Sequence, residues 1–221
     1  MSSAPPPSPL LQAAADLRYL LARGYGRELG LKLTGDRWGL DQSERRLLRR
    51  GVFAPAEAAA RRARLRPLAE AVGQAVALDG HNVLITLETA LGRGRLVLAD
   101  DGLVRDIAEL GRHHQPGPQT LAAARLAIGS LAHAGAASAL VLLEERLPRS
   151  GELAARLREL LLESGLPGQA QAVPVPEEGL KGFAGLVASS DRAVVDQAAR
   201  PLDLAGEIIR RLSPPPILES L

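Results

Sequence analysis

The chain has 221 residues, of which 46% are hydrophobic and 24% are charged, and its net charge is +2. This composition is typical of an ordinary globular chain of one or two domains, and the absence of cysteine excludes disulfides, thiolate zinc sites and cysteine nucleophiles. No apolar run approaches the roughly 18 to 20 residues that span a bilayer, and the start lacks a secretory signal pattern, so we expect a cytoplasmic protein without membrane contact.

The charge is unevenly distributed along the chain. Residues 1–72 hold 13 Lys and Arg against 7 Asp and Glu, whereas residues 73–221 hold 14 against 18. A basic piece joined to an acidic piece indicates two domains with different electrostatic roles. We therefore expect a basic helical domain over 1–72, an α/β domain over 73–213 and a C-terminal tail over 214–221.

The first part of the chain has helical periodicity. Leucine and alanine recur at helical spacing over 10–24, and a shorter helix is expected over 27–33. Asp41 can cap a third helix, and Pro55 can open a fourth that runs to about Pro67. Together these segments predict a small all-α domain with arginine-rich outer faces.

From residue 75 onward, short apolar runs alternate with helical stretches. Runs that suit strands buried on both faces of a parallel sheet cover 75–78, 95–99, 139–143 and 185–188, with a weaker one over 170–175. The helical stretches between them cover 104–110, 121–132 and 151–163. This alternation predicts a three-layer α/β domain with a parallel sheet.

Every strong predicted strand is followed by a carboxylate. These acidic residues are Asp79, Asp100, Asp101, Glu144 and Asp191. Since the carboxyl ends of parallel strands form the ligand crevice of an open sheet, we expect them to converge, and a divalent cation would relieve their repulsion. Oxygen ligands favour Mg²⁺ or Mn²⁺, and a metal held by Asp79, Asp101, Glu144 and Asp191 could drive phosphodiester hydrolysis.

A structural interpretation competes with the metal site. Asp79, Asp101 and Asp191 could each cap the helix that follows. Asn82 is the single asparagine of the chain, three residues after Asp79, and its amide could orient a carboxylate, a water or a phosphate, or simply serve a turn.

The run Asp79-Gly-His-Asn-Val and the later Ser189-Ser190-Asp191 resemble motifs of the nuclease superfamily of PIN and NYN domains. The resemblance covers roughly residues 74–212. It implies a Rossmann-like, PIN-like fold that holds one or two Mg²⁺ or Mn²⁺ ions and typically cuts RNA. Asp79 would be the central metal ligand and Asp191 the late one, supported by Asn82 and Ser190, with Asp100 or Asp101 and Glu144 completing the pocket.

The whole chain also resembles a two-part prokaryotic family whose halves are domains of unknown function. The segments that carry this resemblance include 16–24, 79–86, 98–102 and 150–154. In that pattern the strand before Ser150 usually ends in Asp, whereas here it ends in Glu144. This departure motivates a second hypothesis, a catalytically degenerate module that binds nucleic acid or a partner. Toprim-like and haloacid-dehalogenase-like folds are weaker alternatives, because their acidic motifs are not clear in this chain.

Arginines of the first domain, Arg45 and Arg49 among them, could bind an RNA backbone, or could simply keep the surface soluble. Arg105 could reach the carboxylate pocket or form a surface ion pair. The sequence thus favours a metal-dependent ribonuclease acting on RNA, with the binding module as its alternative, and it leaves open whether the chain forms a homo-oligomer.

Overall fold

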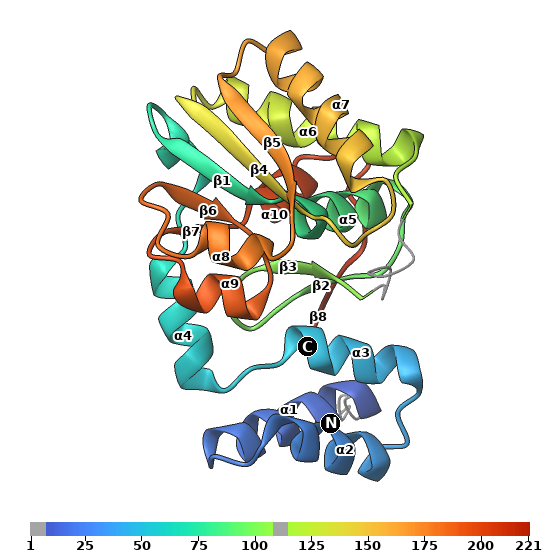
Figure 1. Cartoon of the computed structure of the whole chain (residues 1–221). Helices are drawn as coiled ribbons and strands as arrows, with labels where there is room; N and C mark the ends of the chain where they lie inside the picture. The colour runs from blue at the N-terminus through green and yellow to red at the C-terminus, as the bar shows by residue number, and fades with distance from the viewer. Residues whose placement is uncertain (1–7, 108–114) are drawn as a thin grey trace.

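The computed structural model describes residues 8–107 and 115–221, and it has a mixed α/β architecture (Figure 1). Its first helices are α1 (Pro9–Ala22), α2 (Arg27–Arg37), α3 (Gln42–Gly51) and α4 (Pro55–Arg64), followed by a 3-10 helix over Leu68–Ala71. The four predicted helices are confirmed, although α2 runs past Gly35. The expected cap of α3 is also confirmed, since Asp41 and Glu44 form a capping box.

The α/β part contains a five-stranded parallel sheet in the order β5-β4-β1-β6-β7. Its strands are β1 (Ala75–Asp79), β4 (Ser138–Glu144), β5 (Gly168–Val173), β6 (Leu186–Ala188) and β7 (Pro201–Leu202). Three of the apolar runs that predicted buried strands are β4, β1 and β6, which form the centre of this sheet. The weaker run became the edge strand β5.

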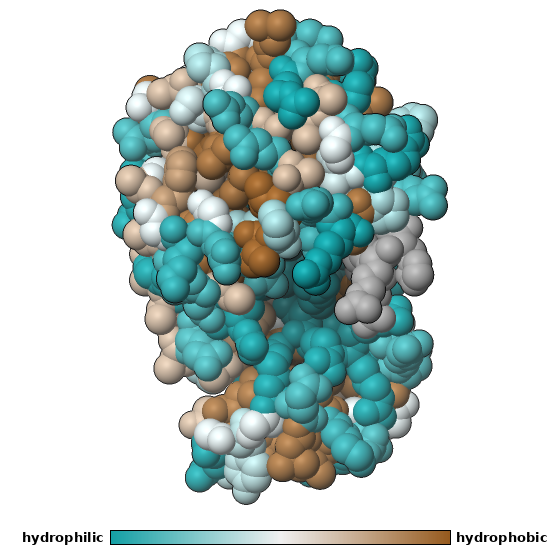
Figure 2. Space-filling view, in the orientation of Figure 1, coloured by the Kyte–Doolittle hydropathy of each residue, from teal (hydrophilic) through white to brown (hydrophobic). Residues whose placement is uncertain are grey.

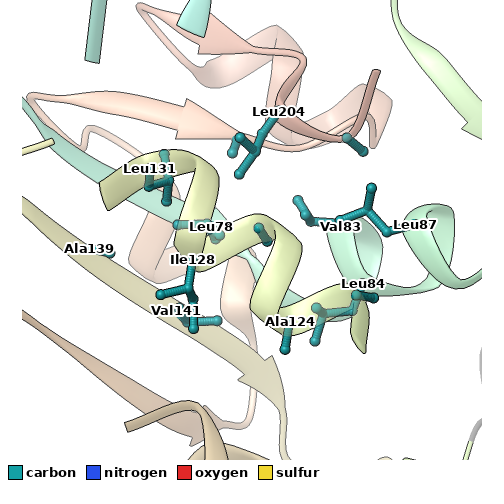
Figure 3. Packing of buried hydrophobic residues seen from close by; sticks show 14 of the residues in the cluster. Leu78, Val83, Leu84, Leu87, Ala124, Ile128, Leu131, Ala139, Val141 and Leu204 are labelled. Carbon is teal, nitrogen blue, oxygen red and sulfur yellow. The ribbon is translucent and has the colours of Figure 1, made fainter. Parts of the chain in front are cut away.

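Helices cover both faces of this sheet, so the predicted three-layer arrangement is confirmed (Figure 1). The helices are α5 (Gly80–Leu91), α6 (Pro118–His133), α7 (Ser150–Glu163), α8 (Pro176–Leu180), α9 (Arg192–Gln197) and α10 (Leu204–Ile209). Because side chains alternate along β1, Val76 and Leu78 pack on the α5, α6, α7 and α10 side, and Ala77 packs under α8 and α9. Figure 3 shows the larger cluster, in which α5, α6 and β4 interdigitate.

A second, three-stranded sheet separates the five-stranded sheet from α1, α2 and α3 (Figure 1). Its order is β3-β2-β8, with β2 at Leu96–Leu98, β3 at Val104–Asp106 and β8 at Leu218–Ser220. Three predictions are corrected here. The run 95–99 is not a strand of the parallel sheet, the start of the expected helix 104–110 is a strand, and the expected tail 214–221 includes a strand that pairs with β2. Residues 108–110 of that expected helix lie outside the described residues.

The helical part is joined to the α/β part through several contacts. The helices α1, α2 and α3 share a small core that includes Leu17, Leu31 and Leu48. The helix α4 instead lies along the α/β part, where the buried side chain of Arg61 pairs with Asp196 of α9 at 2.6 Å. Through this pair α4 lies beside α9, the helix that follows β6.

None of the helices in the described ranges is long and apolar enough to cross a membrane.

Candidate functional site

The centre of the parallel sheet contains a change of direction in the strand order. From β1 the chain continues to β4 and β5 on one side, and then returns to β6 and β7 on the other side. The carboxyl ends of β1 and β6 therefore flank the switch point, the usual ligand crevice of an open α/β sheet. Asp79 ends β1, and Ser189, Ser190 and Asp191 follow β6.

A hydrogen-bond network joins these two strand ends. The Ser189 hydroxyl donates to Asp79 Oδ2 at 2.9 Å, and the Ser190 N–H and hydroxyl donate to Asn82 Oδ1 at 2.7 and 3.0 Å. The Asp191 N–H donates to Ser189 Oγ at 3.0 Å. The structure thus brings together Asp79, Asn82, Ser190 and Asp191, although Asp79 and Asp191 are 112 positions apart in the sequence. Asn82 acts here as an acceptor that ties the two strand ends together.

The Asp79 carboxyl group is in an environment that disfavours its charge. Burial raises the pKa of Asp79 to about 7, and the charges of Asp191 and Glu177 raise it further, against the lowering effect of the hydrogen bonds from Ser189 and Asn82. The Asp79 carboxyl group therefore takes up a proton at a higher pH than an ordinary aspartate does.

Asp191 serves as a helix cap, as the competing interpretation proposed. Its Oδ1 accepts hydrogen bonds from the N–H groups of Ala193 and Val194 at 2.8 and 3.3 Å, at the start of α9. Asp79 also caps α5, but its bond from the Asn82 N–H is long, at 3.5 Å. Asp101 caps no helix, because β3 follows it.

Asp100 and Asp101 do not join this network, so the expected ligand set is corrected. Both follow β2, which belongs to the second sheet and does not end at the switch point. Asp100 forms a bidentate pair with Arg18 at 2.6 and 2.9 Å. Asp101 is fully buried and forms a bidentate pair with Arg105 at 2.7 and 2.8 Å, with Arg61 at 3.5 Å.

Glu144 is also separate from the network. Its backbone N–H donates to His81 Nδ1 at 3.0 Å, but its carboxylate makes no hydrogen bond or ion pair with the described part of the chain. Across residues 8–107 and 115–221, no three or more His, Asp or Glu side chains are grouped so that they could hold a metal ion. The full donor set that we expected for Mg²⁺ or Mn²⁺ is therefore not assembled at this site, because arginines pair with Asp100 and Asp101 and Glu144 lies apart. Of the expected ligands, Asp79 and Asp191 are the two that the Ser189 hydroxyl links.

A pocket lined by arginines lies beside the network. We call it the arginine pocket, and it has a volume of about 200 Å³. Figure 2 shows a hydrophilic hollow where the first helices meet the α/β part. The residues that line the pocket are Arg27, Glu28, Arg49, Arg50, Phe53, Arg105, Ser190, Asp191 and Arg192. They come from α2, α3 and the loop that follows α3, and from β3, the β6–α9 turn and the start of α9, so both parts of the chain build this pocket.

Two of the expected arginines line the pocket and one does not. Arg49 lines it while forming a bidentate pair with Glu28 at 2.6 and 2.8 Å, and Arg105 lines it while its Nε donates to the Ser190 carbonyl at 2.8 Å. Arg105 is therefore in a buried pair near the network and not in a surface pair. Arg45 is elsewhere, paired with Asp36 at 2.9 Å.

The expectations from the sequence did not include Arg27 and Arg192. Arg192 directly follows Ser189-Ser190-Asp191, so its position beside this motif could have indicated that it belongs to the site. Arg27 had no such signal, because only tertiary packing brings α2 to β6.

The ring of Phe53 organises the cations around the pocket. The guanidinium carbons of Arg27, Arg61 and Arg105 lie 4.7, 4.7 and 4.9 Å from the centre of this ring. Burial lowers the pKa of Arg27 to about 10, and the charges of Arg192, Arg105 and Arg49 lower it further. The structure therefore places several positively charged guanidinium groups close together, and a bound anion would reduce the repulsion between them.

Fold and site together define the class of this protein: an open parallel α/β domain with a polar network at its switch point, preceded by helices. The chain belongs to the family described as "Domain of unknown function (DUF5616)", whose model matches residues 68–207. Residues 9–64 match the model of "Protein of unknown function (DUF434)". The resemblance to a two-part family of domains of unknown function is thereby confirmed.

A similar curated protein is "Uncharacterized protein MJ0935" of Methanocaldococcus jannaschii. It is 27% identical over 203 residues, which cover 91% of this chain and 97% of that protein. No solved structure matches the chain. The matching family models name no nuclease, so the resemblance to PIN and NYN domains stays a prediction.

Proposed function

We propose that this protein binds the phosphate groups of RNA at the switch point, through the arginine pocket. One observation carries the proposal: five arginines from four different elements line a single cavity next to Ser190. Arg50 and Arg192 are the clearest candidates for contact, because their guanidinium groups have no hydrogen-bond or ion-pair partner within the part of the chain that the structure describes. Guanidinium groups bind phosphate oxygens through two parallel hydrogen bonds.

The charge balance of the pocket supports an anionic ligand. Glu28 and Asp191 offset two of the five arginines, which leaves a net charge of +3 on the lining. Bringing like charges together costs free energy unless a counter-charge compensates them. The phosphate backbone supplies such a counter-charge, and contacts to it provide most of the affinity of sequence-independent RNA binding.

The proposal takes binding in preference to cleavage, in line with the degenerate module that the sequence left as an alternative. Asp101 is engaged by Arg105, Asp100 by Arg18, and Asp191 by the N–H groups that it caps. In this proposal the carboxylates act as counter-ions that hold arginines in place. RNA is the class of ligand that the PIN and NYN resemblance implies.

The proposal is tested by the binding of labelled single-stranded RNA in a fluorescence anisotropy titration. We expect the double variant Arg50→Gln with Arg192→Gln to bind at least tenfold more weakly, since a hydrogen bond to a charged group contributes about 1.5–3 kcal/mol. The slope of log K against log salt should also fall by about 0.7 for each phosphate that the variant no longer neutralises.

Arg125→Gln is the matched control, because Arg125 is exposed on α6 and does not line the pocket. It removes one positive charge, as each substitution of the double variant does, and should leave both affinity and salt slope unchanged. If the double variant binds RNA with the affinity and the salt slope of the wild type, the proposal is wrong.

Metal-dependent hydrolysis of RNA is a second candidate, and one observation favours it. Asp191 raises the pKa of Asp79, so these two carboxyl groups are close enough to repel each other, and a divalent cation would relieve that repulsion. Incubation of RNA with the protein and Mg²⁺ or Mn²⁺ separates the candidates. If the binding proposal is right, the RNA stays uncut. If the wild type cleaves RNA and Asp79→Asn does not, hydrolysis is the function and the binding proposal is wrong.

A further inference from the structure

The arginine pocket is small and offers no free aromatic face. Its volume of about 200 Å³ is below the roughly 300 Å³ at which pockets for drug-sized ligands begin. The one aromatic ring in its lining, Phe53, is buried and already stacked against three guanidinium groups. A nucleobase therefore has neither the space nor the stacking surface that it needs there, whereas a phosphate group has both space and charge partners.

The arginines of the pocket fall into two groups. Arg49 and Arg105 are each paired with a carboxylate, Glu28 and Asp101, and these pairs hold them in place. Arg27 donates only to the Arg49 carbonyl, and Arg50 and Arg192 have no partner among residues 8–107 and 115–221. Three positive charges without a carboxylate partner thus face one cavity.

The number of unpaired cations distinguishes two kinds of phosphate. An internal phosphodiester carries one negative charge and two free oxygens. A phosphomonoester carries about −1.5 to −2 charges at pH 7 and three acceptor oxygens. Only the monoester comes close to matching three guanidinium groups converging from α2, α3 and α9.

We infer that the arginine pocket binds a terminal phosphate of RNA, a phosphomonoester inserted end-on between the helical part and the α/β part. This inference rests on the proposed function and makes its ligand more specific. The remaining nucleotides would then leave the pocket across the exposed Arg192 side, along the carboxyl edge of the sheet. The helical part is necessary in this arrangement, because it supplies Arg27 and Arg50.

The test compares two single-stranded RNAs of the same sequence, one with a 5′-phosphate and one with a 5′-hydroxyl group. We expect the phosphorylated RNA to bind about tenfold more tightly, and Arg192→Gln to abolish this preference while Arg125→Gln keeps it. A 3′-phosphorylated RNA shows which end enters the pocket. Thermal melting of each variant verifies that it is folded.

The preference for the phosphorylated RNA should depend on pH in a way that a general loss of positive charge from the protein would not produce. The second pKa of a phosphomonoester is about 6, so the ligand loses charge between pH 7.5 and 5.5. We expect the preference for the phosphorylated RNA to shrink over this range, while the affinity for the hydroxyl-ended RNA changes much less.

The outcomes separate this inference from the proposed function. If both RNAs bind equally and both are weakened by Arg192→Gln, the pocket binds internal phosphates, and the inference is overturned while the proposed function stands. If neither RNA binds but AMP or inorganic phosphate does, the monoester pocket stands and RNA is the wrong source. If none of these probes binds, both proposals fall.

Discussion

Replacing Asp101 with alanine is expected to lower the free energy of unfolding by about 3–5 kcal/mol, because it leaves buried charge without its partner. Asp101 is fully buried, and its two oxygens bind the Arg105 guanidinium at 2.7 and 2.8 Å. Arg61, also buried, lies 3.5 Å away. Chemical denaturation of wild type and variant measures the difference.

Asp196→Ala is the matched control for this prediction. Asp196 also binds Arg61, at 2.6 and 2.9 Å, but its side chain is 45% exposed, so water screens its carboxylate. Arg61 is buried but keeps Asp101 at 3.5 Å and Glu57 at 3.7 Å, so we expect a decrease between the roughly 0–1 kcal/mol of an exposed pair and that of Asp101→Ala. Equal small decreases for both variants would show that Asp101 is not the buried counter-ion on which Arg105 depends.

Asp79→Asn should stabilise the protein at pH 8 and have little effect near pH 4. The folded protein raises the pKa of Asp79 to about 7 from an ordinary value of 3.8. Between these values the unfolded chain releases its proton and the folded chain keeps it, so the stability of the wild type falls as pH rises from about 4 to 7 and then levels off. At 1.36 kcal/mol per pH unit, the full effect is roughly 4 kcal/mol.

Asparagine is close to isosteric with the protonated carboxyl group and cannot ionise. Its amide can donate to Ser189 Oγ, which would then donate to Asn82 Oδ1, 3.4 Å away in the present structure. Denaturation at pH 4, 5, 6, 7 and 8 measures the difference in the free energy of unfolding between wild type and variant. Other buried acids, such as Asp203, are present in both proteins, so their contributions cancel in this difference. Parallel curves for wild type and variant would contradict the raised pKa.

The glycine of the Asp79-Gly80 motif shows how a motif residue can have a packing role. A Cβ on Gly80 would lie 2.9 Å from the Leu142 carbonyl oxygen and 2.6 Å from the Leu143 side chain. The start of α5 therefore packs against β4 too closely for any larger residue. This part of the resemblance to PIN and NYN domains thus has a structural explanation in this chain.

Local patterns in the sequence were sufficient to predict most helices and the centre of the parallel sheet. Helical spacing and the Asp41 cap predicted α1 to α4, and continuous apolar runs predicted β1, β4 and β6, because burial on both faces demands apolar side chains at every position. The meeting of Asp79 with Asp191 also followed, since neighbouring parallel strands end at the same edge of a sheet.

Tertiary structure alone decided where the remaining elements and charges went. An apolar run does not specify which strand it pairs with, so 95–99 could be assigned to the parallel sheet until its pairing with β3 and β8 removed Asp100 and Asp101 from the switch point. Whether a carboxylate binds a cation or an arginine depends on side chains that lie far away in the sequence. The arginine pocket shows this dependence, because contacts between α2, α3, β3 and the turn after β6 create it and no local pattern encodes them.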